Sequence, residues 1–331
     1  MGSICDIAGI KIGHYTDRRR PTGCTVIIVE AGAVAGVDVR GSAPGTRETD
    51  LLNPINTVEK VNAILLSGGS AFGLEAASGV MKFLEEQGIG YPTGAARVPI
   101  VPAAVLYDLN LGDAEIRPGA EAGYEACRQA NSEVCQEGNF GAGAGATVGK
   151  LFGFEFAMKG GVGTACLRVG PFLVGAIAVV NCSGDVHDPA TGRILAGARS
   201  PDGRTLRNSV ASMERGESIR RPLGENTTLA VLGTNVQLNK AEVSKLAQMA
   251  QDGLARAIHP AHTPYDGDAV FALSTGDYPI GSIPKAEILT TLGTLAAEAI
   301  SRAILRGVSR AKGLPNLPAY ADLTEDKPGA Y

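Results

Sequence analysis

Five short runs of β-branched and other apolar residues recur along the chain, and each of them predicts a β-strand. Several are apolar at consecutive positions instead of alternate ones, which is typical of strands that are covered on both faces. The runs lie at residues 25–30, 63–67, 171–181, 227–235 and 269–275. The pattern therefore predicts strands with packed layers on either side.

Three segments between these runs carry apolar residues at helical spacing. The clearest begins at Asn239, where Glu242 completes a capping box ahead of an apolar face that runs to Ile258. A second has Pro284 as a first-turn proline and is predicted to stop at Gly307, and a third covers residues 72–86. Helices and strands mixed in this order indicate an α/β or α+β domain in which helices cover the sheet faces.

Two polar segments interrupt this pattern. Residues 183–225 are rich in Pro, Gly and Arg, so they predict hairpin turns and loop instead of core. This segment ends directly at Asn226-Thr227, where a strongly apolar strand begins. The proline-containing tail, residues 313–331, is expected to wrap the surface or to be mobile.

Composition removes several classes of protein. The 331 residues include 44 glycines without a G-X-Y period, and 44% of the chain is hydrophobic, which excludes collagen and a largely disordered chain. Thirty basic residues are scattered among 34 acidic ones, so nothing favours nucleic acid or an anionic membrane as a partner. Six widely spaced cysteines and the absence of a signal peptide or an apolar run of eighteen residues lead us to expect a soluble, cytoplasmic protein.

Three near-matches to known motifs fail on specific residues. The segment GATVGK lacks the first glycine of a phosphate loop, and Leu151 stands where Mg²⁺ binding needs Ser or Thr. Gly141, Gly143 and Ala146 fit G-x-G-x-x-A, but they lead into residues 151–157, which have a strand-like pattern where a helix is required. The pair in HPAH, His259 and His262, is split by a helix-breaking proline and has no nearby cysteine, so no metal is expected.

Thr227 is a candidate nucleophile because of where it stands. A threonine hydroxyl needs a base within hydrogen-bond reach, and a cut between Asn226 and Thr227 would provide one in the new α-amine of Thr227 itself. One residue would then carry both nucleophile and base. Spacing alone favours the simpler interpretation, in which Thr227 and Thr228 are β-formers that open a strand.

A second candidate is the segment Asp266-Gly267-Asp268, which directly precedes the predicted strand at 269–275. Taken alone, D-G-D is ordinary turn chemistry. Paired with Thr227 it becomes a charge and hydrogen-bond partner for an N-terminal ammonium, because the two segments would open neighbouring strands of one sheet.

At these residues the chain resembles the self-cleaving aminopeptidases related to L-aminopeptidase/D-esterase, the β-peptidyl aminopeptidases and the nylon-oligomer (6-aminohexanoate oligomer) hydrolase. The likeness covers nearly the whole chain and makes Thr227 the expected nucleophile. It rests on VRGSAPGTRETDLL from Val39, LLSGGSAFGLEAASGV from Leu65, VPAAVLYDL from Val101, GAGATVGK from Gly143, AVVNCSGDV from Ala178, ENTTLAVLGTN from Glu225 and AIHPAHTPYDGDAVFALST from Ala257.

The resemblance implies an αββα sandwich like that of the N-terminal-nucleophile hydrolases, formed by residues 1–331 as a single domain. It also implies a self-cut at Asn226-Thr227 into an α chain of residues 1–226 and a β chain of residues 227–331. Association into a homotetramer of αβ units is expected, and no metal or cofactor is needed.

The resemblance carries over site by site as well. Thr227 matches the nucleophile, and Asp266 and Asp268 match the acidic or hydroxyl pair behind it. Asn181 matches the asparagine of the oxyanion region. Tyr107 and Lys150 match further site residues. An Asn181 amide or a Tyr107 hydroxyl can donate to a developing oxyanion, and Lys150 can hold a hydroxyl or a carboxylate. The simpler interpretations are that Asn181 is a strand-end turn residue, Tyr107 a core aromatic and Lys150 a surface charge.

The resemblance implies an amide hydrolase that cleaves short peptides, amino-acid amides or ω-amino-acid oligomers through an acyl-enzyme. Many aminopeptidases of this kind have a Gly-Ser junction with a Ser and Glu pair, so Asn-Thr with two aspartates is closer to the nylon-oligomer hydrolase. Two alternatives stay open: an acyltransferase of the ornithine acetyltransferase type, and an unprocessed binding protein. The glycine-rich segments at 67–79, 138–150 and 159–166 are expected to converge around Thr227.

Overall fold

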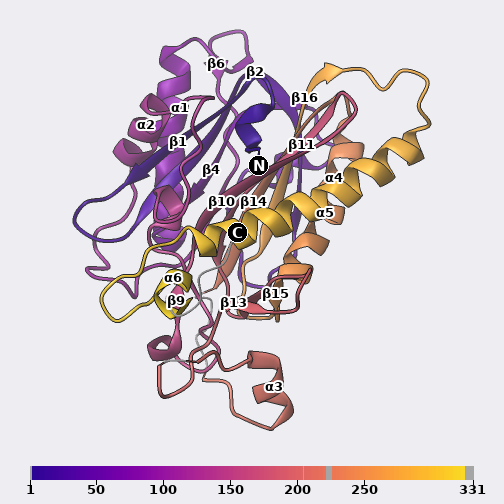
Figure 1. Ribbon diagram of the computed structural model, residues 1–331. Helices are drawn as coiled ribbons and strands as arrows, with labels where there is room; N and C mark the ends of the chain where they lie inside the picture. The colour runs from indigo at the N-terminus through magenta and orange to yellow at the C-terminus, as the bar shows by residue number, and fades with distance from the viewer. Residues whose placement is uncertain (1, 204, 221–225, 325–331) are drawn as a thin grey trace.

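The computed structural model describes residues 2–203, 205–220 and 226–324, and all five predicted strands and three predicted helices are present (Figure 1). The strands are β1 (Ile10–Thr16), β2 (Gly23–Val39), β3 (Gly45–Arg47), β4 (Lys60–Ser67), β5 (Tyr91–Pro92), β6 (Arg97–Val98), β7 (Ala103–Val105), β8 (Thr147–Val148), β9 (Met158–Lys159), β10 (Gly161–Val169), β11 (Phe172–Asn181), β12 (Asp185–His187), β13 (Ile194–Ala196), β14 (Thr227–Val236), β15 (Ile258–His259) and β16 (Ala269–Tyr278). The α-helices are α1 (Ala76–Glu86), α2 (Ala120–Arg128), α3 (Ser209–Glu214), α4 (Lys240–Ala257), α5 (Lys285–Ser309) and α6 (Tyr320–Thr324).

One long strand, β2, joins the two sheet layers of the molecule. The main sheet has the order β10-β11-β14-β16-β2-β4-β7-β3, with β1 paired to β2 off this path. The first part of β2 pairs with β1 and β4, and its last residues pair with β16. The register between β2 and β4 shifts between Ile28 and Ala33, so β2 changes neighbours where its ladder is interrupted.

Three buried clusters lie between four layers, which confirms the predicted αββα arrangement. On β14, Leu229 and Val231 face the cluster between the two sheet layers, whereas Ala230 and Leu232 face the cluster beneath α4 and α5. A third cluster joins β2 and β4 to α1 and α2. Alternate residues of one strand are therefore buried on opposite faces, as consecutive apolar positions predict.

The helix boundaries confirm most of the capping signals. Asn239 accepts a hydrogen bond from the backbone N–H of Glu242, and the Glu242 carboxylate accepts one from the N–H of Asn239, so the capping box is present. Helix α5 begins after Pro284 but continues past Gly307, where the sequence predicted its end. At Gly307 the helix packs closely on β10: a Cβ on Gly163 would lie 2.3 Å from the Gly307 nitrogen, and a Cβ on Gly307 would lie 3.1 Å from the Gly161 carbonyl oxygen.

Helix α5 is the one helix among the described residues that is long and apolar enough to cross a membrane, by length and composition only. Its apolar side chains, including Leu292, Ile300 and Ile304, lie in the same buried cluster as those of β14. These side chains form part of the core beneath α4 and α5.

The polar segment after β11 forms the small strands β12 and β13 and the short helix α3, as its turn residues predict. The strand expected at residues 151–157 is wrong: the chain makes a turn and a 3₁₀ helix at Phe154–Phe156. Gly153 has φ 124°, a backbone conformation that breaks a strand, and the Arg207 guanidinium stacks over the Phe152 ring at 4.2 Å. Parts of the predicted loop and tail, at 204, 221–225 and 325–331, lie outside the described residues.

Candidate active site

Thr227 stands at the first position of β14, between two polar strand ends. In the antiparallel pairing of β11 with β14, Asn181 lies opposite Thr227. On the other side β14 runs parallel to β16, and Asn226 forms a parallel bridge with Asp266 just before β16 begins. The expectation that Thr227 and the D-G-D segment open neighbouring strands is confirmed.

The peptide bond before Thr227 is held by two donors. The Thr227 hydroxyl donates to the Asn226 carbonyl oxygen at 2.5 Å, and the Gly267 backbone N–H donates to the same oxygen at 2.8 Å. Residue 267 has to be glycine at this approach, because a Cβ there would lie 2.6 Å from the Ala43 carbonyl oxygen and 2.9 Å from the Thr227 Oγ1. A hydroxyl thus lies against the carbonyl group that it would attack, and that oxygen already accepts a backbone hydrogen bond.

Asp266 and Asp268 are buried carboxylates, 1% and 2% exposed. Asp266 accepts hydrogen bonds from the Ser183 hydroxyl at 3.0 Å and from the backbone N–H and hydroxyl of Thr263. Burial and the neighbouring Asp268 carboxylate nevertheless raise the pKa of Asp266 above its ordinary value. The charge on the Asp268 carboxylate therefore disfavours ionisation of Asp266, so the pKa of Asp266 is shifted upward by its neighbour as well as by burial.

Asp268 connects this acidic pair to the start of β14. One carboxylate oxygen accepts the Thr228 backbone N–H at 2.7 Å. The other accepts two hydrogen bonds from His262, one from the backbone N–H at 3.0 Å and one from the ring Nδ1 at 2.9 Å. Both carboxylate oxygens of Asp268 are therefore held by donors, and one of these donors is the N–H of the residue that follows Thr227.

Asn181 is oriented by three donors that converge on its side-chain oxygen. Its Oδ1 accepts the Thr147 backbone N–H at 2.9 Å, the Thr147 hydroxyl at 3.2 Å and the Lys150 ammonium at 3.0 Å. Its Nδ2 donates to the Tyr107 carbonyl oxygen at 3.2 Å. Lys150 is only 2% exposed, so its interpretation as a surface charge is wrong.

The six residues that the sequence singled out lie at one end of β11, β14 and β16, joined by direct contacts or strand register. Tyr107 contacts Asn181 through its carbonyl oxygen, and the oxyanion role predicted for its hydroxyl stays a prediction. The roles predicted for Thr227, Asp266, Asp268, Asn181 and Lys150 also stay predictions at this point.

Comparison with known proteins decides the family. A family model described as peptidase family S58 matches residues 2–317. The chain belongs to this family. An uncharacterised aminopeptidase of Mycobacterium tuberculosis is 42% identical to this S58 chain, over 100% of the chain and 99% of the relative. A 6-aminohexanoate-oligomer endohydrolase of Kocuria sp. is 31% identical, over 91% of the chain and 84% of the relative.

Solved structures confirm the fold expected for an S58 protein. The L-aminopeptidase D-Ala-esterase/amidase of Ochrobactrum anthropi, described as a variant of the Ntn hydrolase fold, superposes with a TM-score of 0.70 at 19% identity, covering 96% of this chain and 89% of that one. A β-aminopeptidase of Burkholderia sp. gives a TM-score of 0.68 at 21% identity, covering 98% and 95%. The resemblance recognised from the sequence motifs is confirmed.

The glycine-rich segments converge on the S58 site only in part. Segment 138–150 reaches it, because Thr147 and Lys150 contact Asn181. Segment 159–166 instead packs β10 against α5, and Gly79 in segment 67–79 packs α1 against α2. These last two are packing features, whereas Gly267 and Gly41, which lie outside the three segments, approach Thr227 and the aspartates.

The sequence reasoning missed four polar residues that contact the predicted ones: Thr147, Ser183, His262 and Thr263. All four stand within five residues of a predicted site residue in the chain, so their position near strand ends was the available signal. His262 was examined only as a metal ligand, and the structure places it on Asp268 instead.

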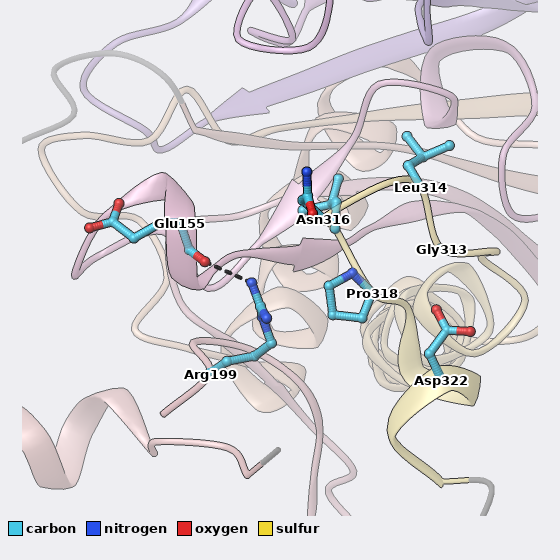
Figure 2. A pocket seen from close by; sticks show the side chains of 8 residues that line it. Glu155, Arg199, Gly313, Leu314, Asn316, Pro318 and Asp322 are labelled. Carbon is cyan, nitrogen blue, oxygen red and sulfur yellow. Dashed lines mark hydrogen bonds between the residues drawn. The ribbon is translucent and has the colours of Figure 1, made fainter. Parts of the chain in front are cut away.

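A cavity of about 690 Å³ lies elsewhere, along the C-terminal segment (Figure 2). Arg199 lies at its edge and donates to the Glu155 carbonyl oxygen, while Asn316, Pro318 and Asp322 line the opposite side. None of the six predicted site residues lines this cavity.

Proposed function

We propose that this S58 peptidase is an amide hydrolase that processes itself at Asn226-Thr227 and then uses Thr227 as an N-terminal nucleophile. The observation that carries the proposal is the contact between the Thr227 hydroxyl and the Asn226 carbonyl oxygen, which also accepts the Gly267 N–H. Inside a β-sheet, a hydroxyl held on the preceding carbonyl group is positioned to attack it.

Self-processing would proceed as an N-to-O acyl shift. Thr227 Oγ1 attacks the Asn226 carbonyl carbon, the C–N bond to Thr227 breaks, and the hydroxyl proton ends on the new amine. Water then hydrolyses the ester to leave a carboxylate on Asn226 and a free hydroxyl on Thr227. The Gly267 N–H would stabilise the oxyanion in the first step. The Asn226 side chain supports a cut at this bond. Its buried amide nitrogen and oxygen have no hydrogen-bond partner within the described chain, which costs free energy, and the cut would relieve that cost.

Substrate hydrolysis would reuse the same atoms. The Thr227 α-amine takes the hydroxyl proton as Oγ1 attacks the substrate carbonyl, the leaving amine receives that proton, and water releases the acyl group. The Asn181 side chain, whose Oδ1 is held by three donors, would donate from its NH₂ group to the oxyanion. Asp266 and Asp268 would hold the Thr227 ammonium, which needs carboxylates close by.

Short peptides, amino-acid amides and ω-amino-acid oligomers are the proposed substrates. Support comes from the relatives, which include an aminopeptidase and a 6-aminohexanoate-oligomer endohydrolase. Assembly into a tetramer of αβ units, in the cytoplasm, completes the proposal.

The decisive experiment compares wild-type protein with Thr227→Ala and Thr227→Ser. Intact-mass spectrometry of the wild type should show residues 1–226 and 227–331 as separate chains, and a panel of dipeptides, amino-acid amides and 6-aminohexanoate oligomers should include a substrate. Thr227→Ala should remain one chain and lose hydrolysis by at least about 1,000-fold, because the nucleophile is gone. Thr227→Ser keeps a hydroxyl and should still be cut.

A full-length wild type that hydrolyses amides, or an active Thr227→Ala variant, would overturn the proposal. Adding an amine acceptor separates hydrolysis from acyl transfer, since a hydrolase gives the same acid product with or without it.

A further inference from the structure

His262 is a titratable residue that the proposed reaction leaves unused. Its side chain is 21% exposed, and its ring Nδ1 lies 2.9 Å from the Asp268 carboxylate, which is 2% exposed. The imidazole therefore reaches from the protein surface to the buried acidic pair behind Thr227.

The hydrogen-bond partners fix the tautomer of the imidazole. A carboxylate oxygen is an acceptor only, so against Asp268 the Nδ1 of His262 carries the proton and donates. The backbone N–H of His262 donates to the same Oδ2, at 3.0 Å. Two donors from one residue thus hold one oxygen of Asp268 in place.

The other oxygen of Asp268 acts on the nucleophile's own strand. Oδ1 accepts the Thr228 N–H at 2.7 Å, and that N–H belongs to the peptide group directly after Thr227. If Asp268 rotated about its side-chain bonds, this hydrogen bond and the position of Thr227 would change together. The contacts form a continuous series from His262 through Asp268 to the first peptide group of β14.

The geometry points to His262 as a positioning residue, which keeps the Asp268 carboxylate oriented toward the start of β14 for both self-processing and amide hydrolysis. This inference rests on the proposed function. His262 is given no contact with the substrate or the reacting atoms, and its effect passes through Asp268.

The backbone of His262 provides a matched pair of test variants. Its φ is 56°, in the left-handed region that Gly adopts freely and Asn tolerates better than most residues. His262→Gly removes the side-chain donor without backbone strain. His262→Asn also suits this backbone, and its Nδ2 is bonded to Cγ as the histidine Nδ1 is, so it restores a donor at the same place.

The experiment measures two rates for wild type, His262→Gly and His262→Asn. The first is the conversion of full-length chain to residues 1–226 and 227–331, followed by intact mass. The second is kcat and KM of the fully processed protein on the best substrate of the panel. Thermal unfolding midpoints of the two variants are compared to detect a general loss of structure.

His262→Gly should slow processing and lower kcat by about tenfold or more, the effect of losing a hydrogen bond to a charged group, with KM within about twofold of wild type. His262→Asn should recover most of both rates. Equal rates for the two variants, or a kcat loss that follows the unfolding midpoint, would overturn the positioning role while leaving the proposed function intact. A wild type that neither cuts itself nor hydrolyses the panel would overturn both.

Discussion

Two lysines nine residues apart in the chain are both buried, and they have different surroundings. Lys150 is 2% exposed and donates to the carbonyl oxygen and the side-chain oxygen of Asn181, opposite Thr227. Lys159 is fully buried and donates to three carbonyl oxygens, those of Gly143, Ala146 and Gly160. Burial alone therefore does not indicate whether a lysine belongs to the candidate site. The acceptors of its hydrogen bonds indicate this better.

The difference assigns the two lysines to different tasks. The N–H bonds of Lys159 are directed to three carbonyl acceptors, so its side chain joins backbone segments and is unsuited to contact a substrate. Lys150 instead helps orient the side chain of Asn181, the residue paired with Thr227 across β11 and β14. Substitutions at the two positions should therefore have different consequences, and equal consequences would show that the two lysines do not have different tasks.

Of the substitutions that test the comparison of the two lysines, Lys150→Met is expected to have the largest effect, a loss of catalysis. Methionine has a similar length but cannot donate to Asn181, so the amide loses one of the donors that set its orientation. We expect kcat to fall by about 100-fold, in the range seen when an oxyanion donor is impaired, with a smaller change in KM. Steady-state kinetics of processed protein measures this. A Lys150→Met variant with wild-type kcat would remove Lys150 from the site.

Lys159→Met should act on stability instead. The substitution leaves three buried carbonyl oxygens without their donor, which we expect to cost about 3 kcal/mol in the free energy of unfolding. Urea unfolding in a Thr227→Ala background, where the chain is expected to stay in one piece, gives this value. The kcat of molecules that remain folded should change less than twofold, and a loss comparable to that of Lys150→Met would contradict the comparison.

The smallest effect is a pH dependence of stability. Burial lowers the pKa of Lys159 from 10.5 to about 7, so the folded state binds fewer protons than the unfolded state between these values. The contribution of Lys159 to stability is therefore present above pH 10.5 and is lost as the pH falls toward 7. Between pH 7.5 and 9 the unfolding free energy should rise by about 1 kcal/mol per pH unit relative to Lys159→Met. Parallel curves for the two proteins would show that Lys159 does not titrate in this range.

The sequence predicted the strand layers and the residues at strand ends well, because local patterns determine both. Consecutive apolar residues in β14 indicated burial on both faces, and the D-G-D turn next to β16 indicated its place beside Thr227. The strand predicted at 151–157 failed because alternating aromatic residues there pack around Arg207, and a glycine at φ 124° turns the chain.

The partners of the site residues were beyond prediction, since they depend on how distant segments meet. Thr147 reaches Asn181 across 34 positions, and Ser183 reaches Asp266 across 83. Gly267 was visible only as a turn residue, although its N–H and its missing side chain are what allow the Asn226 carbonyl group and the Thr227 hydroxyl to approach each other.

The central place of β14 and β16 has a consequence for the protein after a cut at Asn226-Thr227. These strands lie between β11 and β2 of the preceding segment, so the two products would remain hydrogen-bonded along both edges. Once separated by denaturant, however, they would have to find each other in solution. Refolding would then be a second-order association, and the unfolding temperature of the mature protein would depend on its concentration in a way that the uncut chain's does not.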